Sequence, residues 1–99
     1  MVTTRMLSDI RDYVLNNVSY VRIYIAGQWV VYGDIHGRPE GDNKVIYEFP
    51  IERTGQVTKV ELYRKGNVLW DDRNESFTVE LIEGTDALIY QLIYTISVY

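Results

Sequence analysis

Residues 87–99 read ALIYQLIYTISVY, and this stretch contains no charged residue, no glycine and no proline. It is rich in β-branched and aromatic residues, which suit a pleated surface. Alternate positions form an unbroken apolar row on one face, made of Leu88, Tyr90, Leu92, Tyr94, Ile96 and Val98, and the other face is half polar. The pattern predicts a strand of about 43 Å at roughly 3.3 Å per residue, about twice the usual length.

The beginning of the chain predicts one short helix, over about residues 4–16. Thr3 or Thr4 suits the N-cap position of such a helix. Apolar residues recur at spacings of three and four, at Met6, Leu7, Ile10, Tyr13 and Val14. Because a helix of this length is marginal by itself, we expect this stripe to pack on the face of a sheet.

Short β-rich runs separated by turn residues fill the rest of the chain. We predict strands over residues 18–26, 29–32, 44–52, 57–63, 68–70, 76–82 and 87–99, with a tight turn at Gly27 and Gln28. Residues 33–43 are predicted to form the longest loop, and residues 71–74 a polar loop in which Asp71 and Asp72 are a solvated turn.

About seven strands and no helix of crossover length predict a mainly β fold. The expected architecture is an antiparallel β-sandwich or open barrel with one short N-terminal α-helix. The sequence does not distinguish the two forms. Residues 1–99 are expected to form a single domain, since 99 residues can enclose one modest core.

Composition excludes several classes of site. The chain has no cysteine and one histidine, so neither a disulfide framework nor a thiolate metal site is available. A formal net charge of -4 argues against a general function in nucleic-acid binding through phosphates. Charged residues near the N-terminus interrupt the apolar run that a signal peptide needs. The uncharged run at residues 87–99 is too short for a membrane-spanning helix. We therefore expect no membrane partner, and an intracellular protein or a part of an assembled particle.

The segment GDIHG at residues 33–37 is the one stretch of the sequence that resembles a metal-binding motif. It resembles the first metal-binding motif of the calcineurin-like metallophosphoesterases, in which an Asp and a His two residues apart follow a strand. That resemblance implies Asp34 and His36 as metal ligands. Two-metal hydrolysis needs several further ligands, and this chain has no second histidine. We therefore predict no catalytic residues, no cofactor and no metal site, with Asp34 and His36 as the sole weak candidates.

Nine tyrosines make the chain unusually rich in that residue. Tyr20, Arg22 and Tyr24 share one face of the predicted strand 18–26, which would suit a stacking platform for single-stranded nucleic acid. The net negative charge of the chain argues against binding of single-stranded nucleic acid. Tyrosine is also enriched where proteins meet proteins, because its ring is rigid and its hydroxyl stays hydrated.

The last predicted strand also suggests an interface between subunits. As a free edge it would promote aggregation, since no lysine or proline protects it. It must therefore be central in its sheet or paired with another chain. The other predicted strands are too short to cover it, and its end offers the candidate interface residues Tyr94, Ile96, Val98 and Tyr99. A bent terminus, or a strand that crosses two packed sheets, would explain the surplus equally well.

Three stretches resemble small β-rich structural proteins of viruses that infect prokaryotes, including phage tail and head-tail components. They are LSDIRDYV at residues 7–14, VTKVELYRKGNVLW at residues 57–70, and the uncharged stretch at residues 87–99. The resemblance implies an assembly role without catalysis. We expect a non-enzymatic structural module that makes protein–protein contacts, as a homo-oligomer or a virion part. The alternatives are a metal-dependent phosphoesterase-like relic that uses the GDIHG segment, and a single-strand nucleic-acid binder.

Overall fold

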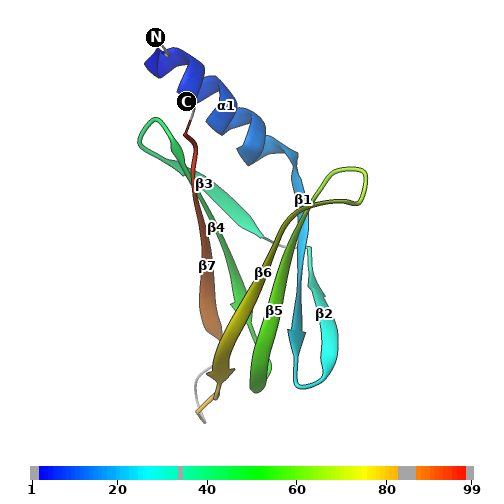
Figure 1. Ribbon diagram of the computed structural model, residues 1–99. Coiled ribbons are helices and arrows are strands. Elements are labelled where there is room, and N and C mark those ends of the chain that lie inside the picture. The colour runs from blue at the N-terminus through cyan, green and yellow to red at the C-terminus, as the bar shows by residue number, and fades with distance from the viewer. Residues whose placement is uncertain (1–2, 34, 83–86, 98–99) are drawn as a thin grey trace.

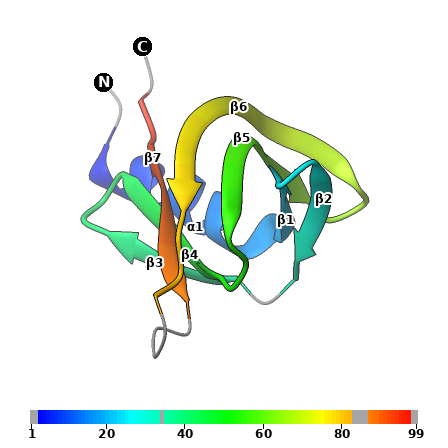
Figure 2. The ribbon, with the colours of Figure 1, turned by 90° about the horizontal axis from the view of Figure 1, so that it is seen from below.

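The computed structural model describes residues 3–33, 35–82 and 87–97. One helix, α1 (Thr4–Asn17), precedes seven strands, which are β1 (Val18–Ile25), β2 (Gln28–Tyr32), β3 (His36–Glu40), β4 (Lys44–Ile51), β5 (Gly55–Arg64), β6 (Val68–Val79) and β7 (Leu88–Thr95). The strands form two antiparallel sheets, in the orders β2-β1-β5-β6 and β3-β4-β7 (Figures 1 and 2). The predicted class is confirmed, and within the described residues the sheets stay open and do not close into a barrel.

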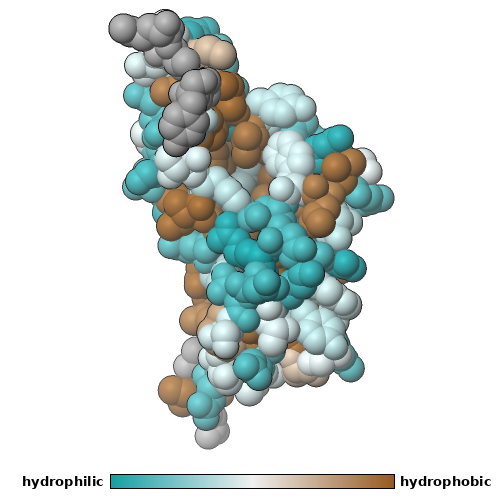
Figure 3. Space-filling model, viewed as in Figure 1, coloured by the Kyte–Doolittle hydropathy of each residue, from teal (hydrophilic) through white to brown (hydrophobic). Residues whose placement is uncertain are grey.

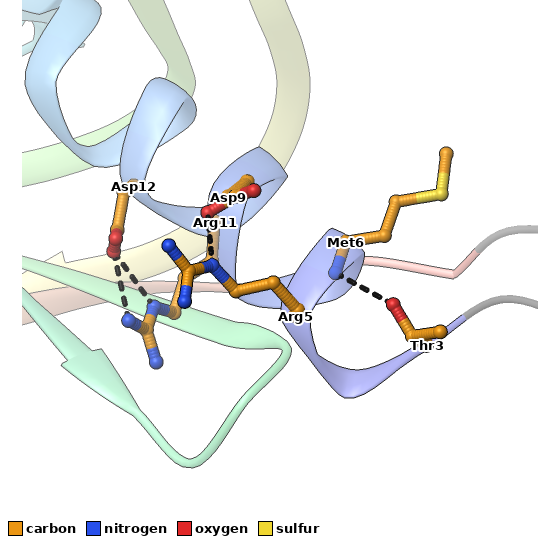
Figure 4. Close-up of polar contacts among 6 residues, drawn as sticks. All are labelled: Thr3, Arg5, Met6, Asp9, Arg11 and Asp12. Atoms are coloured by element: carbon orange, nitrogen blue, oxygen red, sulfur yellow. Dashed lines mark hydrogen bonds and ion pairs between the residues drawn. The ribbon is translucent and has the colours of Figure 1, made fainter.

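The helix begins as the sequence predicts. The Thr3 hydroxyl accepts a hydrogen bond from the backbone N–H of Met6 at 3.2 Å, which satisfies one donor of the first turn. Figure 4 shows this cap beside two ion pairs on the helix surface, Arg5 with Asp9 and Arg11 with Asp12. The exposed Arg5–Asp9 pair adds little to stability, so the cap is the main local determinant of the helix start.

The helix lies across one end of the two sheets and contacts β3 and β4 (Figure 1). Val14 and Leu15 pack against the core, and Val14 accepts a hydrogen bond on its carbonyl oxygen from the Tyr47 hydroxyl at 2.7 Å. Met6 and Tyr13 remain 48% and 61% exposed. The prediction that the whole stripe packs on a sheet face is therefore wrong, because a helix placed at the end of a sandwich presents only a narrow side to it.

The core lies between the inner faces of the two sheets. Strand β1 alternates as predicted, with Val21, Ile23 and Ile25 fully buried. Facing it, β4 contributes four buried side chains, Val45, Tyr47, Phe49 and Ile51, and β7 contributes Leu92. The hairpin between β1 and β2 turns at Ala26 and Gly27, both with positive φ (52° and 77°), which a type I′ turn requires. The turn therefore falls one residue earlier than predicted.

The predicted loop 33–43 contains a strand. β3 pairs with β4 from His36 opposite Glu48 to Glu40 opposite Lys44. Gly37 permits this pairing, because a Cβ there would lie 2.8 Å from Tyr47 Cε1 and 2.9 Å from Leu15 Cδ1. The glycine of the GDIHG segment thus has a packing role: it lets a buried ring and the helix approach the edge strand closely.

Residues 71–74 are also strand and not the predicted loop. They form the middle of β6, which continues from Val68 to Val79 opposite β5 with two register shifts. Its charged residues misled the prediction because their partners are distant in sequence. Asp71 and Arg73 lie opposite Leu62 and Val60, which are buried on the inner face. In Figure 3 the most hydrophilic side chains of that view gather over the middle of β6.

β7 is shorter than predicted and is an edge strand. All eight of its residues pair with the eight residues of β4, from Leu88 opposite Ile51 to Thr95 opposite Lys44. One further backbone bond joins the Ile96 N–H to the Asn43 carbonyl oxygen at 2.7 Å. Of the two expected alternatives, a central position is wrong for the described residues, and pairing with another chain stays a prediction. The expectation that no partner strand would cover β7 is wrong, because β4 does so, whereas the predicted alternation of its faces is right.

Candidate functional site

The outer face of the four-stranded sheet carries a cluster of aromatic and charged side chains. We call it the aromatic face and define it by Tyr20, Arg22, Tyr24, Trp29, Glu61 and Tyr63. These residues come from β1, β2 and β5, and the pairing places them side by side: Tyr24 lies opposite Trp29, Arg22 opposite Glu61, and Tyr20 opposite Tyr63. Helix α1 contacts the other sheet, at β3 and β4.

An ion pair forms the centre of the aromatic face. Arg22 Nε donates a hydrogen bond to Glu61 Oε1, and the Tyr63 hydroxyl donates to the same oxygen at 3.1 Å. Glu61 is only 6% exposed although it lies on an outer face. A carboxylate so poorly hydrated depends on these two donors, so the pair fixes the position of the Arg22 guanidinium.

Aromatic rings surround this ion pair. Arg22 Cζ lies 4.1 Å from the centre of the Trp29 ring and 5.5 Å from that of Tyr63, within the range of cation–π attraction. Tyr20 stacks on Tyr63 at a centroid distance of 4.7 Å, and Tyr24 meets Trp29 edge-on at 5.2 Å. Trp29 nevertheless remains 41% exposed. The result is a continuous platform whose side chains are held by contacts with one another.

The charges of this face compensate each other. The hydrogen bond to Glu61 and the charge of that carboxylate outweigh partial burial and raise the pKa of Arg22. Burial, with help from Glu61, raises the pKa of Tyr63, so both groups keep their ordinary charge at neutral pH. The neighbouring Lys59 pairs with Asp72 at 3.2 Å. Each of the two cations is thus bound to a carboxylate, and the platform suits an uncharged partner surface better than a phosphate backbone.

A second polar cluster lies inside the open side of the sandwich. The Tyr94 hydroxyl donates to Asp71 Oδ2 at 2.6 Å, Arg73 Nη2 donates to the same oxygen at 2.8 Å, and the Tyr90 hydroxyl donates to Glu75 at 2.8 Å. Burial alone would raise the pKa of Asp71, but the bonds from Tyr94 and Arg73 hold it below its ordinary value. Burial and Glu75 raise the pKa of Tyr90 to about 12. These bonds join β6 to β7 and have a structural role.

The predicted interface residues lie next to this cluster. Tyr94 and Ile96 are half-buried, pack against the core, and line a pocket of about 250 Å³ with Val14, Trp70 and Asp71. Their inward orientation gives both side chains a role within the chain's own fold. Val98 and Tyr99 lie outside the described residues, and an interface at these four positions stays a prediction.

Of the two predicted metal candidates, the described structure includes only His36. His36 is exposed on β3 opposite Glu48, whereas Asp34 lies outside the described residues. Within residues 3–33, 35–82 and 87–97, no group of three or more His, Asp or Glu side chains could hold a metal ion. The described residues likewise include no helix long and apolar enough to cross a membrane.

Comparison of the chain with family models, curated proteins and solved structures finds no match. The function must therefore be argued from the molecule itself.

Sequence reasoning found only part of the aromatic face. It placed Tyr20, Arg22 and Tyr24 on one strand face but missed Trp29, Glu61 and Tyr63. The tight β1–β2 turn could have located Trp29, since a two-residue hairpin fixes the register. The pairing of β1 with β5 joins positions 39 residues apart at Arg22 and Glu61, and no local pattern encodes it.

Proposed function

We propose that this chain is a non-enzymatic assembly module whose copies associate through the aromatic face. The observation that carries the proposal is a rigid cluster of Trp, Tyr and Arg side chains, left open on a sheet face with its charges paired internally. Trp, Tyr and Arg are the residue types that dominate the energetics of protein interfaces. Trp and Tyr bury large areas at a small cost in conformational entropy, and Arg22 is already held in place by Glu61.

The pairing of charges favours a second copy as the partner. When two copies of one face meet about a two-fold axis, residues near the axis meet their own copies, and an unpaired charge there would repel its counterpart. Here Arg22 is bound to Glu61 and Lys59 to Asp72 within each copy. Two such faces can therefore approach each other without net repulsion, and Trp29 and Val31, 41% and 61% exposed, would become buried.

Sedimentation velocity over a concentration range around micromolar tests the proposal. Trp29→Ala should weaken self-association by at least about thirtyfold, the effect of losing one interface hot spot. Tyr13→Ala is the matched control, because Tyr13 is an exposed aromatic residue on the helix, away from this face, with 61% exposure against 41% for Trp29. A wild-type chain that stays monomeric throughout, or two variants that behave alike, would contradict the proposal.

Single-strand nucleic-acid binding is the competing use of the same residues. It predicts salt-dependent retardation of an oligonucleotide in a gel, lost on Tyr20→Ala. The paired state of Arg22 and Lys59 leaves this face without the free cations that such binding uses. The phosphoesterase-like alternative predicts Mn²⁺ or Zn²⁺ binding that Asp34→Ala removes, which calorimetry measures.

We further propose that the protein is a component of a virus particle and that it lies in the host cytoplasm before the particle assembles. Its support is the resemblance of three sequence stretches to small structural proteins of prokaryotic viruses. A self-associating, non-catalytic β module is what such a particle would need.

A further inference from the structure

The two sheets expose four edge strands, and these differ in how well they are protected. β3 carries Arg38, Pro39 and Glu40, and β6 carries four charged residues within residues 71–75 and two register shifts. Charges, prolines and irregular pairing are the usual devices that keep a sheet edge from pairing with another chain. β2 and β7 have none of them, and β7 is the longer, with eight residues against five.

The direction of the backbone groups along β7 follows from its pairing with β4. The Ile96 N–H donates to the Asn43 carbonyl oxygen, in continuation of the register that places Tyr94 opposite Val45. Because hydrogen-bonded and non-hydrogen-bonded pairs alternate in an antiparallel ladder, even-numbered residues direct their backbone groups to β4. Odd-numbered residues, from Ile89 to Thr95, direct theirs to the free edge. The side chains of these odd-numbered residues share the exposed outer face of the sheet.

We propose that a second copy of the chain adds to this free edge, β7 against β7 in antiparallel orientation, with Gln91 on the two-fold axis. The two three-stranded sheets then become one continuous sheet of six strands. About six backbone hydrogen bonds join the copies, two at each of three hydrogen-bonded pairs. This contact uses a different sheet from the aromatic face and does not depend on the proposed function.

The charge pattern of β7 selects a second copy as the occupant. A strand that pairs with itself about a two-fold axis brings its central residues next to their own copies, so any charge near its centre would meet the same charge. The sequence from Leu88 to Thr95 is LIYQLIYT and has no charge to repel. Gln91 is a suitable central residue, because its side-chain amide already donates to Glu48 at 2.8 Å and is held in place.

The apolar residues select the register. When the pair is centred on Gln91, Ile89 of each copy lies opposite Ile93 of the other copy. These side chains are 58% and 51% exposed in the single chain. A shift that moves the axis to Leu92 would place Ile89 opposite Thr95 and expose more apolar surface. Pro50 and Ile46 lie beside Ile89 and Ile93 in the β4 pairing. The chosen register therefore joins the apolar side chains of two copies into one band across the outer face.

A cysteine at position 91 tests the contact and its register. The chain has no cysteine of its own. In the proposed register Gln91→Cys places two thiols opposite each other in a hydrogen-bonded pair, with Cα atoms about 5.5 Å apart, a separation that a disulfide can span. We expect mild oxidation to give a covalent dimer of twice 11.6 kDa. Thr78→Cys, an exposed position on the edge strand β6, is the control and should give no comparable dimer.

A charge on the axis provides the second test. Gln91→Lys should keep the wild-type melting behaviour of the monomer and weaken the non-covalent contact by about tenfold, because two ammonium groups would oppose each other. Thr78→Lys is its control. Equal cross-linking of the two cysteine variants, or equal association of the two lysine variants, would overturn the proposal. An edge that instead receives a strand from a different protein would leave the purified chain without any β7-dependent association, which would also overturn it.

Discussion

The hydrogen bond from Tyr94 to Asp71 gives a sharp test of how the open side of the sandwich is held. Tyr94→Phe removes the hydroxyl that donates to Asp71 Oδ2 at 2.6 Å and leaves the ring beside Tyr47 and Arg73. A hydrogen bond to a charged group contributes about 1.5–3 kcal/mol to stability. Because the Asp71 side chain is 30% exposed and water can partly replace the donor, we expect the lower value, about 1.5 kcal/mol.

The dependence of this loss on pH identifies its cause. The pKa of Asp71 is held below its ordinary value of 3.8, so the ionised form is stabilised by folding. That stabilisation is complete above the unfolded pKa and disappears as the pH falls through the folded pKa. The difference between wild type and Tyr94→Phe should therefore be largest near neutral pH and smaller at about pH 2, where a neutral acid accepts a weaker bond.

Urea denaturation of four proteins measures the effect. They are the wild type, Tyr94→Phe, Asp71→Asn and the double variant, whose double-mutant cycle isolates the coupling between the two side chains. Tyr24→Phe is the control on the exposed outer face and should change the free energy of unfolding by less than about 0.5 kcal/mol. A coupling near zero at neutral pH, or a Tyr94→Phe loss that does not shrink in acid, would refute the reasoning.

Three further substitutions have defined outcomes, each measured by denaturation with a two-state fit. Gly37→Ala should destabilise the fold by about 1–3 kcal/mol, since the new methyl group would overlap the buried Tyr47 ring, whereas Gly33→Ala, with open space around it, should be nearly neutral. Thr3→Ala should cost about 1 kcal/mol through loss of the helix cap, and Thr3→Ser should restore most of it. Glu61→Gln should cost about 2 kcal/mol by leaving the Arg22 guanidinium without its counter-charge, and a loss below about 0.5 kcal/mol would contradict the importance of that pair.

The sequence predicted correctly those strands in which apolar and polar residues alternate along the chain. Alternation correctly placed Tyr20, Arg22 and Tyr24 on one face of β1, and it assigned the inward face of β7, including Leu92. The same logic failed for β6, where a charged stretch was interpreted as a loop. Arg73 and Asp71 are compatible with a strand only because Tyr94, 23 residues beyond Asp71, supplies a partner from the other sheet.

β3 and the aromatic face also depend on partners that are distant in sequence, which local patterns do not predict. Glycine and proline in residues 36–40 indicated a loop, yet Gly37 is needed there because the Tyr47 ring and Leu15 leave no room for a Cβ. The partner that explains it belongs to β4 and α1. On the aromatic face, Arg22 and Glu61 become one site only when β1 pairs with β5. Periodicity assigns faces to strands, but the order of strands in a sheet decides which residues meet.

The most direct test of the account is the mass of four proteins in sedimentation velocity at one common concentration, chosen above the dissociation constants of the two wild-type contacts and below those of the substituted contacts. They are the wild type, Trp29→Ala, Gln91→Lys and the double variant. Two independent two-fold contacts predict wild-type species larger than a dimer, a dimer for each single variant, and a monomer of 11.6 kDa for the double variant. A wild-type chain that sediments as a monomer at every concentration would contradict the claim that these two exposed surfaces serve assembly.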